Sequence, residues 1–149
     1  MAGISINVSG TWQTLKTVAV NVGGTWQTVK SVWMNVGGTW QRVFNSILTA
    51  IASPTSVSGT ASGTVVVTVV SSATTVTVTG GTPGYTYSWA LVSGNALTIT
   101  SPSSATTTFS RSMSGNTSVT AVYRCTVHDA VGSTATADVS VELDHNNTQ

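Results

Sequence analysis

The segment VTAVYRCTVH, residues 119–128, decides the fold of the larger part of the chain. Its odd-numbered positions are all apolar, and Thr120, Arg124, Thr126 and His128 lie between them. A period of two residues places successive side chains on opposite faces of a β-strand. The segment therefore predicts a strand with one face in a core and the other toward solvent.

The same alternation continues on both sides of this strand. Residues 129–132 predict a turn, and residues 135–143 then repeat the pattern with Asp138 and Glu142 among the outward positions. Further candidate strands occupy residues 64–70, 75–79, 85–91, 95–100 and 106–110. About seven short strands at regular spacing predict an all-β fold, with an immunoglobulin-like β-sandwich over residues 59–144.

Two segments carry a resemblance to known families. GGTPGYTYSW, residues 80–89, resembles the opening of PKD-type and related bacterial immunoglobulin-like domains, and YRCTVHDAVG, residues 123–132, resembles the F strand and F–G turn of immunoglobulin folds. Trp89 matches the strand-C tryptophan, and Tyr123 stands two residues before Cys125, as in a tyrosine corner. The resemblance implies that Trp89, Tyr123 and Cys125 lie in the core, and it leaves the function open.

The beginning of the chain is an internal repeat with a period of 14 residues. Its three copies begin at Asn7, Asn21 and Asn35, each with the pattern Asn-Val-Gly/Ser-Gly-Thr-Trp. Gly23-Gly24 and Gly37-Gly38 suit the positive φ angles of two-residue hairpin turns, and Ser9-Gly10 is a weaker version.

Polar pairs alternate with these turns and predict the opposite turns of a meander. They are Lys16-Thr17, Lys30-Ser31 and Asn45-Ser46. Residues 1–47 therefore predict three hairpin repeats, arranged as an antiparallel meander of about six short strands in one small sheet.

Tryptophan recurs at one place in each repeat. Trp12, Trp26 and Trp40 are expected to stack as a ladder and, with Trp33, to form an assembly interface, because such a small sheet does not bury both of its faces. Aromatic faces also stack on sugars, so a carbohydrate-binding role remains an alternative.

The repeat is similar to segments of bacteriophage tail and other virion structural proteins, where such repeats adjoin adhesive or immunoglobulin-like domains. This resemblance implies a virion protein that binds other virion proteins and forms homo-oligomers. Trimers are common among fibre-like proteins of this kind.

Two connecting segments look irregular. Residues 48–58 contain Pro54 together with Ser and Gly, which predicts a linker between the repeats and the sandwich. Residues 145–149 predict a solvated polar tail.

Composition excludes several classes of function. Charged residues make up 6% of the chain, against about 25% in an average soluble domain, so hydroxyl groups must cover the surface. Lys16, Lys30 and Arg42 are scattered and form no nucleic-acid footprint. No run approaches the ~20 apolar residues of a membrane span. The start lacks a signal-peptide pattern, so we expect synthesis in the host cytoplasm and a location in the virion.

Reactive side chains are few and do not converge. Cys125 is the single cysteine, and a spacing of three on a strand directs it away from His128, so we interpret it as a buried thiol. Asp129, Asp138 and Asp144 are too dispersed for a calcium loop, and we assign Asp129 to the turn at residues 129–132. We expect no enzymatic activity, cofactor or metal.

These observations together predict a non-catalytic virion structural protein, tail-associated or capsid-decorating. The repeat region would anchor it, and the sandwich would project outward. The alternative is an adhesion module that binds carbohydrate on a host-cell surface.

Overall fold

The computed structural model describes residues 5–8, 11–14, 18–29, 31–45 and 47–147. Every regular element in these ranges is a β-strand. The predicted all-β fold class is confirmed.

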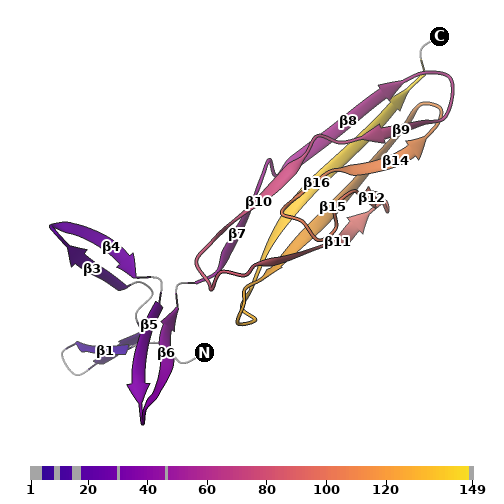
Figure 1. Ribbon diagram of the computed structural model, residues 1–149. Coiled ribbons are helices and arrows are strands. Elements are labelled where there is room, and N and C mark those ends of the chain that lie inside the picture. Colours follow the sequence, from indigo (N-terminus) through magenta and orange to yellow (C-terminus); the bar gives the residue numbers. More distant parts are fainter. Residues whose placement is uncertain (1–4, 9–10, 15–17, 30, 46, 148–149) are drawn as a thin grey trace.

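One layer of the main body is a four-stranded sheet with the order β11-β15-β16-β8 (Figure 1). Its strands are β11 (Thr86–Gly94), β15 (Thr117–His128), β16 (Thr134–Asn146) and β8 (Ser56–Ser62). The pairs β11–β15 and β15–β16 are antiparallel, and β16–β8 is parallel.

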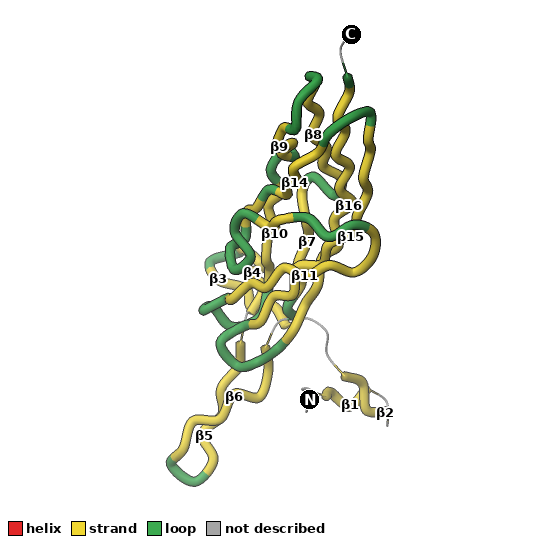
Figure 2. Tube along the Cα trace, turned by 90° about the vertical axis from the view of Figure 1, so that its right-hand side faces the viewer, coloured by secondary structure: helices red, strands yellow, loops and turns green. Residues whose placement is uncertain are grey.

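The opposite layer consists of two three-stranded sheets, β13-β10-β7 and β12-β14-β9. Their strands are β7 (Thr49–Ser53), β9 (Val67–Val70), β10 (Thr74–Thr79), β12 (Thr98–Ile99), β13 (Thr106–Thr107) and β14 (Phe109–Met113). Figure 2 shows the two layers from the side, with loops at both ends.

The core lies between the layers and follows the predicted alternation. In β15 the side chains at 121, 123, 125 and 127 are buried, and in β16 those at 137, 139, 141 and 143 are buried. Phe109 is fully buried between Trp89 and Tyr123, with ring centroids 5.8 Å and 4.6 Å away. Such aromatic contacts add about 0.5–1.5 kcal/mol each to the free energy of burial.

Residues 48–58 are part of this core, so the predicted linker is wrong. They hold strand β7 and the start of β8, and Leu48, Ala52 and Val57 are buried. Pro54 stands between the two strands, where the chain changes partner from β10 to β16. Proline is tolerated there because it interrupts no strand.

The predicted polar tail is also wrong for residues 145 and 146. Strand β16 continues to Asn146, and the side chain of His145 is fully buried. His145 is paired with Thr117 of β15 on one side and Ala61 of β8 on the other. Strands on both sides hold this segment in place, and its alternation continues that of residues 135–143.

The repeats form three separate two-stranded hairpins. They are β1 (Ser5–Val8) with β2 (Thr11–Thr14), β3 (Val18–Val22) with β4 (Thr25–Val29), and β5 (Ser31–Val36) with β6 (Thr39–Asn45). Among the described residues no strand of one hairpin pairs with a strand of another, so the predicted meander in one sheet is wrong. Each pairing is local, because the double-glycine turn brings only its own two flanks together.

The predicted glycine turns are confirmed where the structure describes them. Gly23 and Gly24 have φ angles of 61° and 84°, and Gly37 and Gly38 have 60° and 88°. The Asn21 side-chain oxygen accepts a hydrogen bond of 2.9 Å from the N–H of Gly24, and Asn35 does the same for Gly38. The repeated asparagine therefore stabilises the turn that follows it.

The opposite turns differ from the prediction or lie outside the described residues. Ser9-Gly10, Lys16-Thr17, Lys30 and Ser46 are not described. Ser31 and Asn45 face each other as the end pair of β5 and β6 instead of forming turns. The third hairpin is the longest of the three, and a bulge at Val32/Trp33 accommodates its unequal strands.

Candidate functional site

The predicted assembly residues lie at equivalent positions of the hairpins. Trp12, Trp26 and Trp40 pair across the strands with Asn7, Asn21 and Asn35 in the same register. Because the three hairpins form separate sheets, the expected single ladder across one sheet is wrong.

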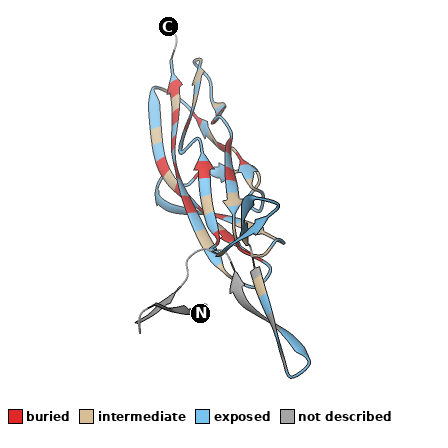
Figure 3. Ribbon diagram, turned by 90° about the vertical axis from the view of Figure 1, so that its left-hand side faces the viewer, coloured by how far each residue is buried: buried red, intermediate tan, exposed pale blue. Residues whose placement is uncertain are grey.

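The described tryptophan side chains of the hairpins are exposed. Trp26 is 72% exposed, Trp40 65% and Trp33 52%, and the side chain of Trp12 lies outside the described residues. In the second hairpin Val20 and Val22 are exposed as well, and no residue of β3 or β4 is buried. Figure 3 shows this contrast between the exposed hairpin and the buried core of the sandwich. An isolated two-stranded hairpin is at best marginally stable in water, so this exposed apolar surface is a candidate binding surface.

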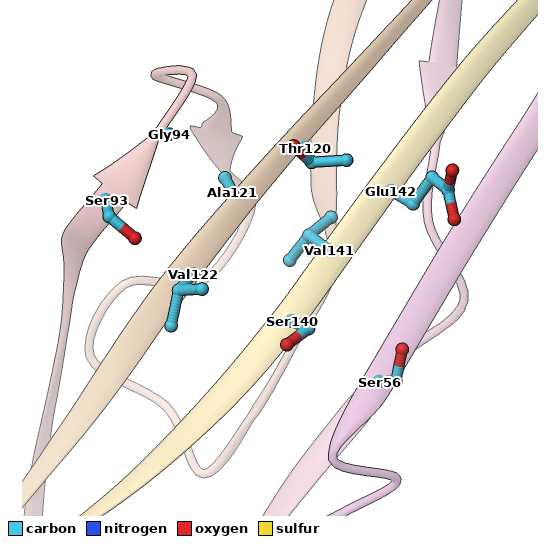
Figure 4. A pocket seen from close by; sticks show the side chains of 9 residues that line it. All are labelled: Ser56, Ser93, Gly94, Thr120, Ala121, Val122, Ser140, Val141 and Glu142. Carbon is cyan, nitrogen blue, oxygen red and sulfur yellow. The ribbon is translucent and has the colours of Figure 1, made fainter.

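A second feature is a groove on the outward face of the four-stranded sheet (Figure 4). Its volume is about 230 Å³, and it crosses β11, β15, β16 and β8. Its polar side chains are Ser93, Thr120, Ser140, Glu142 and Ser56.

Strand register defines how these side chains lie. Ser93, Val122, Ser140 and Ser56 form one row across all four strands, because each is paired with the next. Glu142 and Thr120 are paired in the next outward row. Directly opposed residues have Cβ atoms about 4.5–5.5 Å apart, as Thr120 and Glu142 are. Ser140 lies two residues from Glu142 on the same face of β16, so the three polar side chains form the centre of the groove.

A β-bulge brings Ser93 to this face. The alternation of Tyr87 and Trp89, which point toward the core, would direct Ser93 inward as well. The register shift between Leu91 and Ser93 pairs Ser93 with Val122 on the outward face instead. Bulges commonly redirect a side chain in this way near functional sites. The alternation of apolar residues in the sequence gives no signal of this bulge.

The polar side chains of the groove make no hydrogen bond to any described residue. Hydroxyl groups on the other layer behave differently, since Thr49 pairs with Thr79 at 2.6 Å and Thr75 with Thr106 at 2.9 Å. The groove therefore presents free donors and acceptors to solvent.

The charge beside the groove is fixed by one ion pair. Arg124 donates two hydrogen bonds to Asp138, of 2.6 Å and 2.7 Å, on the same outward face. The hydrogen bond from Arg124 lowers the pKa of Asp138, and the same bond raises the pKa of Arg124. With Asp138 neutralised in this way, Glu142 is the unpaired carboxylate of the groove.

Cys125 and His128 do not form a catalytic pair. Burial raises the pKa of the Cys125 thiol to about 11, against a weaker opposing hydrogen bond from the backbone of Ser88. His128 is exposed, and its Nδ1 lies 3.2 Å from the hydroxyl of Thr134. A protonated, buried thiol is a poor nucleophile.

The prediction that Asp129 serves the turn after β15 is confirmed. Its carboxylate accepts hydrogen bonds from the N–H groups of Val131 and Ser133, at 3.0 Å and 2.7 Å. It also accepts one of 2.9 Å from Thr82, which joins this turn to the loop at residues 80–84. Burial acts to raise the pKa of Asp129, but these bonds together hold it below its ordinary value.

The core residues inferred by resemblance belong to the buried core of the sandwich. Trp89, Tyr123 and Cys125 are all buried. The Tyr123 hydroxyl donates to the carbonyl of Leu97 and accepts from its N–H, at 3.0 Å and 2.7 Å. A tyrosine corner bonds to backbone a few residues upstream, whereas Leu97 precedes Tyr123 by 26 residues.

His145 is a buried polar residue that sequence reasoning placed in solvent. Its Nδ1 lies 2.5 Å from the carbonyl oxygen of Gly115, and its Nε2 has no hydrogen-bond partner among the described residues. The sequence signal for its burial was its odd-numbered position, which continues the alternation of buried residues along β16.

Metal-ligand clusters and membrane-spanning helices are both absent from the residues that the structure describes. Within these ranges no three His, Cys, Asp or Glu side chains gather as metal ligands. The described part of the chain also holds no helix long and apolar enough to cross a membrane.

Comparison with known proteins assigns no family. No family model matches the sequence, and no curated protein matches it. Among solved structures, the chain is similar to a nucleoside hydrolase-related hypothetical protein from Saccharophagus degradans that is associated with carbohydrate metabolism. The identity is 16% and the TM-score 0.31, over 78% of this chain and 25% of that protein. The chain thus spans a quarter of that protein's length, and so distant a likeness carries no functional argument.

Proposed function

We propose that this chain is a non-catalytic structural protein of a virion, tail-associated or capsid-decorating. The three hairpins attach it to identical chains and to other virion proteins, and the sandwich projects from that attachment. The proposal concerns binding through shape and contact, without a chemical step.

The exposed tryptophans of the hairpins carry this proposal. Trp26 and Trp40 occupy the same position in two hairpins and are both largely exposed. A Trp side chain buries 150–250 Å² when it is covered, which at about 25 cal/mol per Å² corresponds to ~4–6 kcal/mol for each. Only association supplies such burial to a hairpin that has no core.

The sandwich supports the other half of the proposal, because it forms a closed core of its own. Its pairings place β10 between β7 and β13, and β15 between β11 and β16. This order is compatible with the two sheets of an immunoglobulin-like domain, which we propose for this module. A domain with its own core can project without contacts from the hairpins.

The virion setting is supported by sequence features. The Gly-Gly-Thr-Trp repeat resembles segments of phage structural proteins, and the single cysteine leaves the fold independent of an intrachain disulfide. The scarcity of charge leaves hydroxyl groups over most of the sandwich surface.

Sedimentation velocity of the full chain over a concentration series tests the attachment role. We expect concentration-dependent oligomers for the native chain and monomers for the double variant Trp26→Ser, Trp40→Ser. Val66→Ser is the matched control, since Val66 is also exposed (68%) but lies in a loop of the sandwich, and it should associate like the native chain. A native chain that stays monomeric at every concentration would contradict attachment to identical chains.

A further inference from the structure

The geometry points to a second binding site: we propose that the groove centred on Glu142, Ser140 and Thr120 binds a neutral sugar residue. This site lies on the sandwich and involves no tryptophan, so it is separate from the attachment surface of the hairpins. It gives the projecting module a ligand.

The chemistry of the polar groups selects the ligand class. An ionised carboxylate is an acceptor only, with two oxygens, whereas a hydroxyl both donates and accepts. Vicinal hydroxyls of a sugar can donate one hydrogen bond to each carboxylate oxygen of Glu142. Thr120 is directly paired with Glu142, and Ser140 precedes Glu142 by two residues on the same face of β16. Their hydroxyls supply the complementary donors.

The floor of the groove suits the apolar face of a sugar ring. Val122 supplies an outward-facing apolar side chain, whereas Ala121 and Val141 line the groove with their side chains buried in the core. A side chain at position 94 is excluded, because a Cβ there would lie 2.4 Å from the backbone oxygen of Thr120. Glycine at this point lets the backbone of β11 approach that of β15 closely at this edge of the groove.

The size of the groove limits the ligand. A volume of 230 Å³ falls below the range of drug-sized pockets. Ser56 and Ser93 lie on the two edge strands, three strand spacings apart, which is about 14 Å. One ring therefore fills the centre, and these two serines can contact the next units of a glycan chain.

Charge argues against two other ligand classes. Glu142 and Asp144 project from the outward face without an ion-pair partner among the described residues, whereas Asp138 is neutralised by Arg124. Acidic sugars would meet like charge there. A calcium ion takes six to eight oxygen ligands, and one carboxylate with a few hydroxyls offers a poor site.

Saturation-transfer difference NMR on the full chain tests the site, because it observes the ligand and tolerates a large assembly. The probes are methyl mannoside, methyl galactoside, methyl glucoside and N-acetylglucosamine, with glucuronate as the acidic comparison. We expect saturation of at least one neutral sugar. Glucuronate should bind about fivefold more weakly, the factor that corresponds to a like-charge repulsion of ~1 kcal/mol.

Variants decide whether the groove is responsible. Glu142→Ala should weaken binding about tenfold or more, as expected for loss of hydrogen bonds to a charged group. Ser140→Ala should weaken it about two- to tenfold, as expected for loss of a neutral hydrogen bond. Thr126→Ala and Thr136→Ala are the controls, because these paired residues lie on the same face toward the other end of β15 and β16. The proposal is overturned by no saturation of any neutral sugar, by binding that survives Glu142→Ala, or by equal binding of glucuronate. Each of these results leaves the attachment role of the hairpins standing.

Discussion

The thiol of Cys125 provides a direct probe of the core. Because burial raises its pKa to about 11, the folded protein keeps the thiol protonated where an unfolded chain begins to ionise. Stability linked to this group is present below the unfolded pKa and is lost as pH rises from about 9 to about 11. We expect a thiol-specific reagent at about pH 8 to label the unfolded chain and spare the native one.

Rapid stoichiometric labelling of the native protein at that pH would contradict the buried position of Cys125. A Cys125→Ser variant is the control for labelling elsewhere, and it should give no signal in either state.

Asp129 is expected to make the sandwich acid-sensitive. Its pKa is held below the ordinary value, so its contribution is present above the unfolded pKa of about 3.9 and is lost as pH falls through the lower, folded pKa. The midpoint of urea unfolding should therefore fall with acidification more steeply in the native chain than in Asp129→Asn. Parallel pH profiles for the two proteins would show that the carboxylate does not hold the turn.

At the scale of the element, Gly59 fixes how closely β8 approaches β9. A Cβ at this position would lie 2.1 Å from the backbone oxygen of Val70, and Ser72 donates a hydrogen bond of 2.9 Å to the carbonyl of Ser58 beside it. Backbone cannot yield as a flexible side chain does, so Gly59→Ala should lower the free energy of unfolding by about 1–3 kcal/mol, the usual cost of overpacking.

Urea unfolding measures this loss. Thr60→Ala, at the next and exposed position of β8, should change stability by less than about 0.5 kcal/mol. Equal stability of the two variants would contradict the close contact of the strands.

The positive φ angle at Gly38 restricts which residue the turn of the third hairpin accepts. Nothing lies within 4 Å of a Cβ built at Gly38, where φ is +88°, so space is available and only strain opposes a side chain. Gly38→Val should cost the third hairpin about 1–2 kcal/mol, whereas Asn tolerates this region better. Amide chemical shifts should then show loss of the hairpin in Gly38→Val and its retention in Gly38→Asn, with the sandwich unchanged in both.

Strands with strong local patterns were predictable, and those that depend on distant partners were not. Residues 119–128 and 135–143 alternate cleanly, and a double glycine specifies its own turn. Strand β8 has small residues in place of an apolar pattern, and its partner β16 lies about 80 positions away in the sequence. The groove was missed because serine and threonine occur throughout the chain, and because the bulge that redirects Ser93 leaves no periodic trace.

The whole molecule combines two kinds of structure with opposite needs. The sandwich buries a continuous core that includes Phe109, Val139 and Leu143, and this burial accounts for its stability without a partner. The second hairpin has no buried residue, and its tryptophan faces solvent. The sandwich therefore has a core of its own, the second hairpin has none, and we propose that association occurs through the hairpins.

Acrylamide quenching of tryptophan fluorescence over a dilution series tests this claim most directly. Trp89 is buried in the core and gives a protected signal at every concentration. If the hairpins associate, the remaining emission should be shielded in concentrated protein and become quenchable on dilution, together with dissociation of the oligomer. Hairpin tryptophans that are equally open to quencher at every concentration would contradict the account.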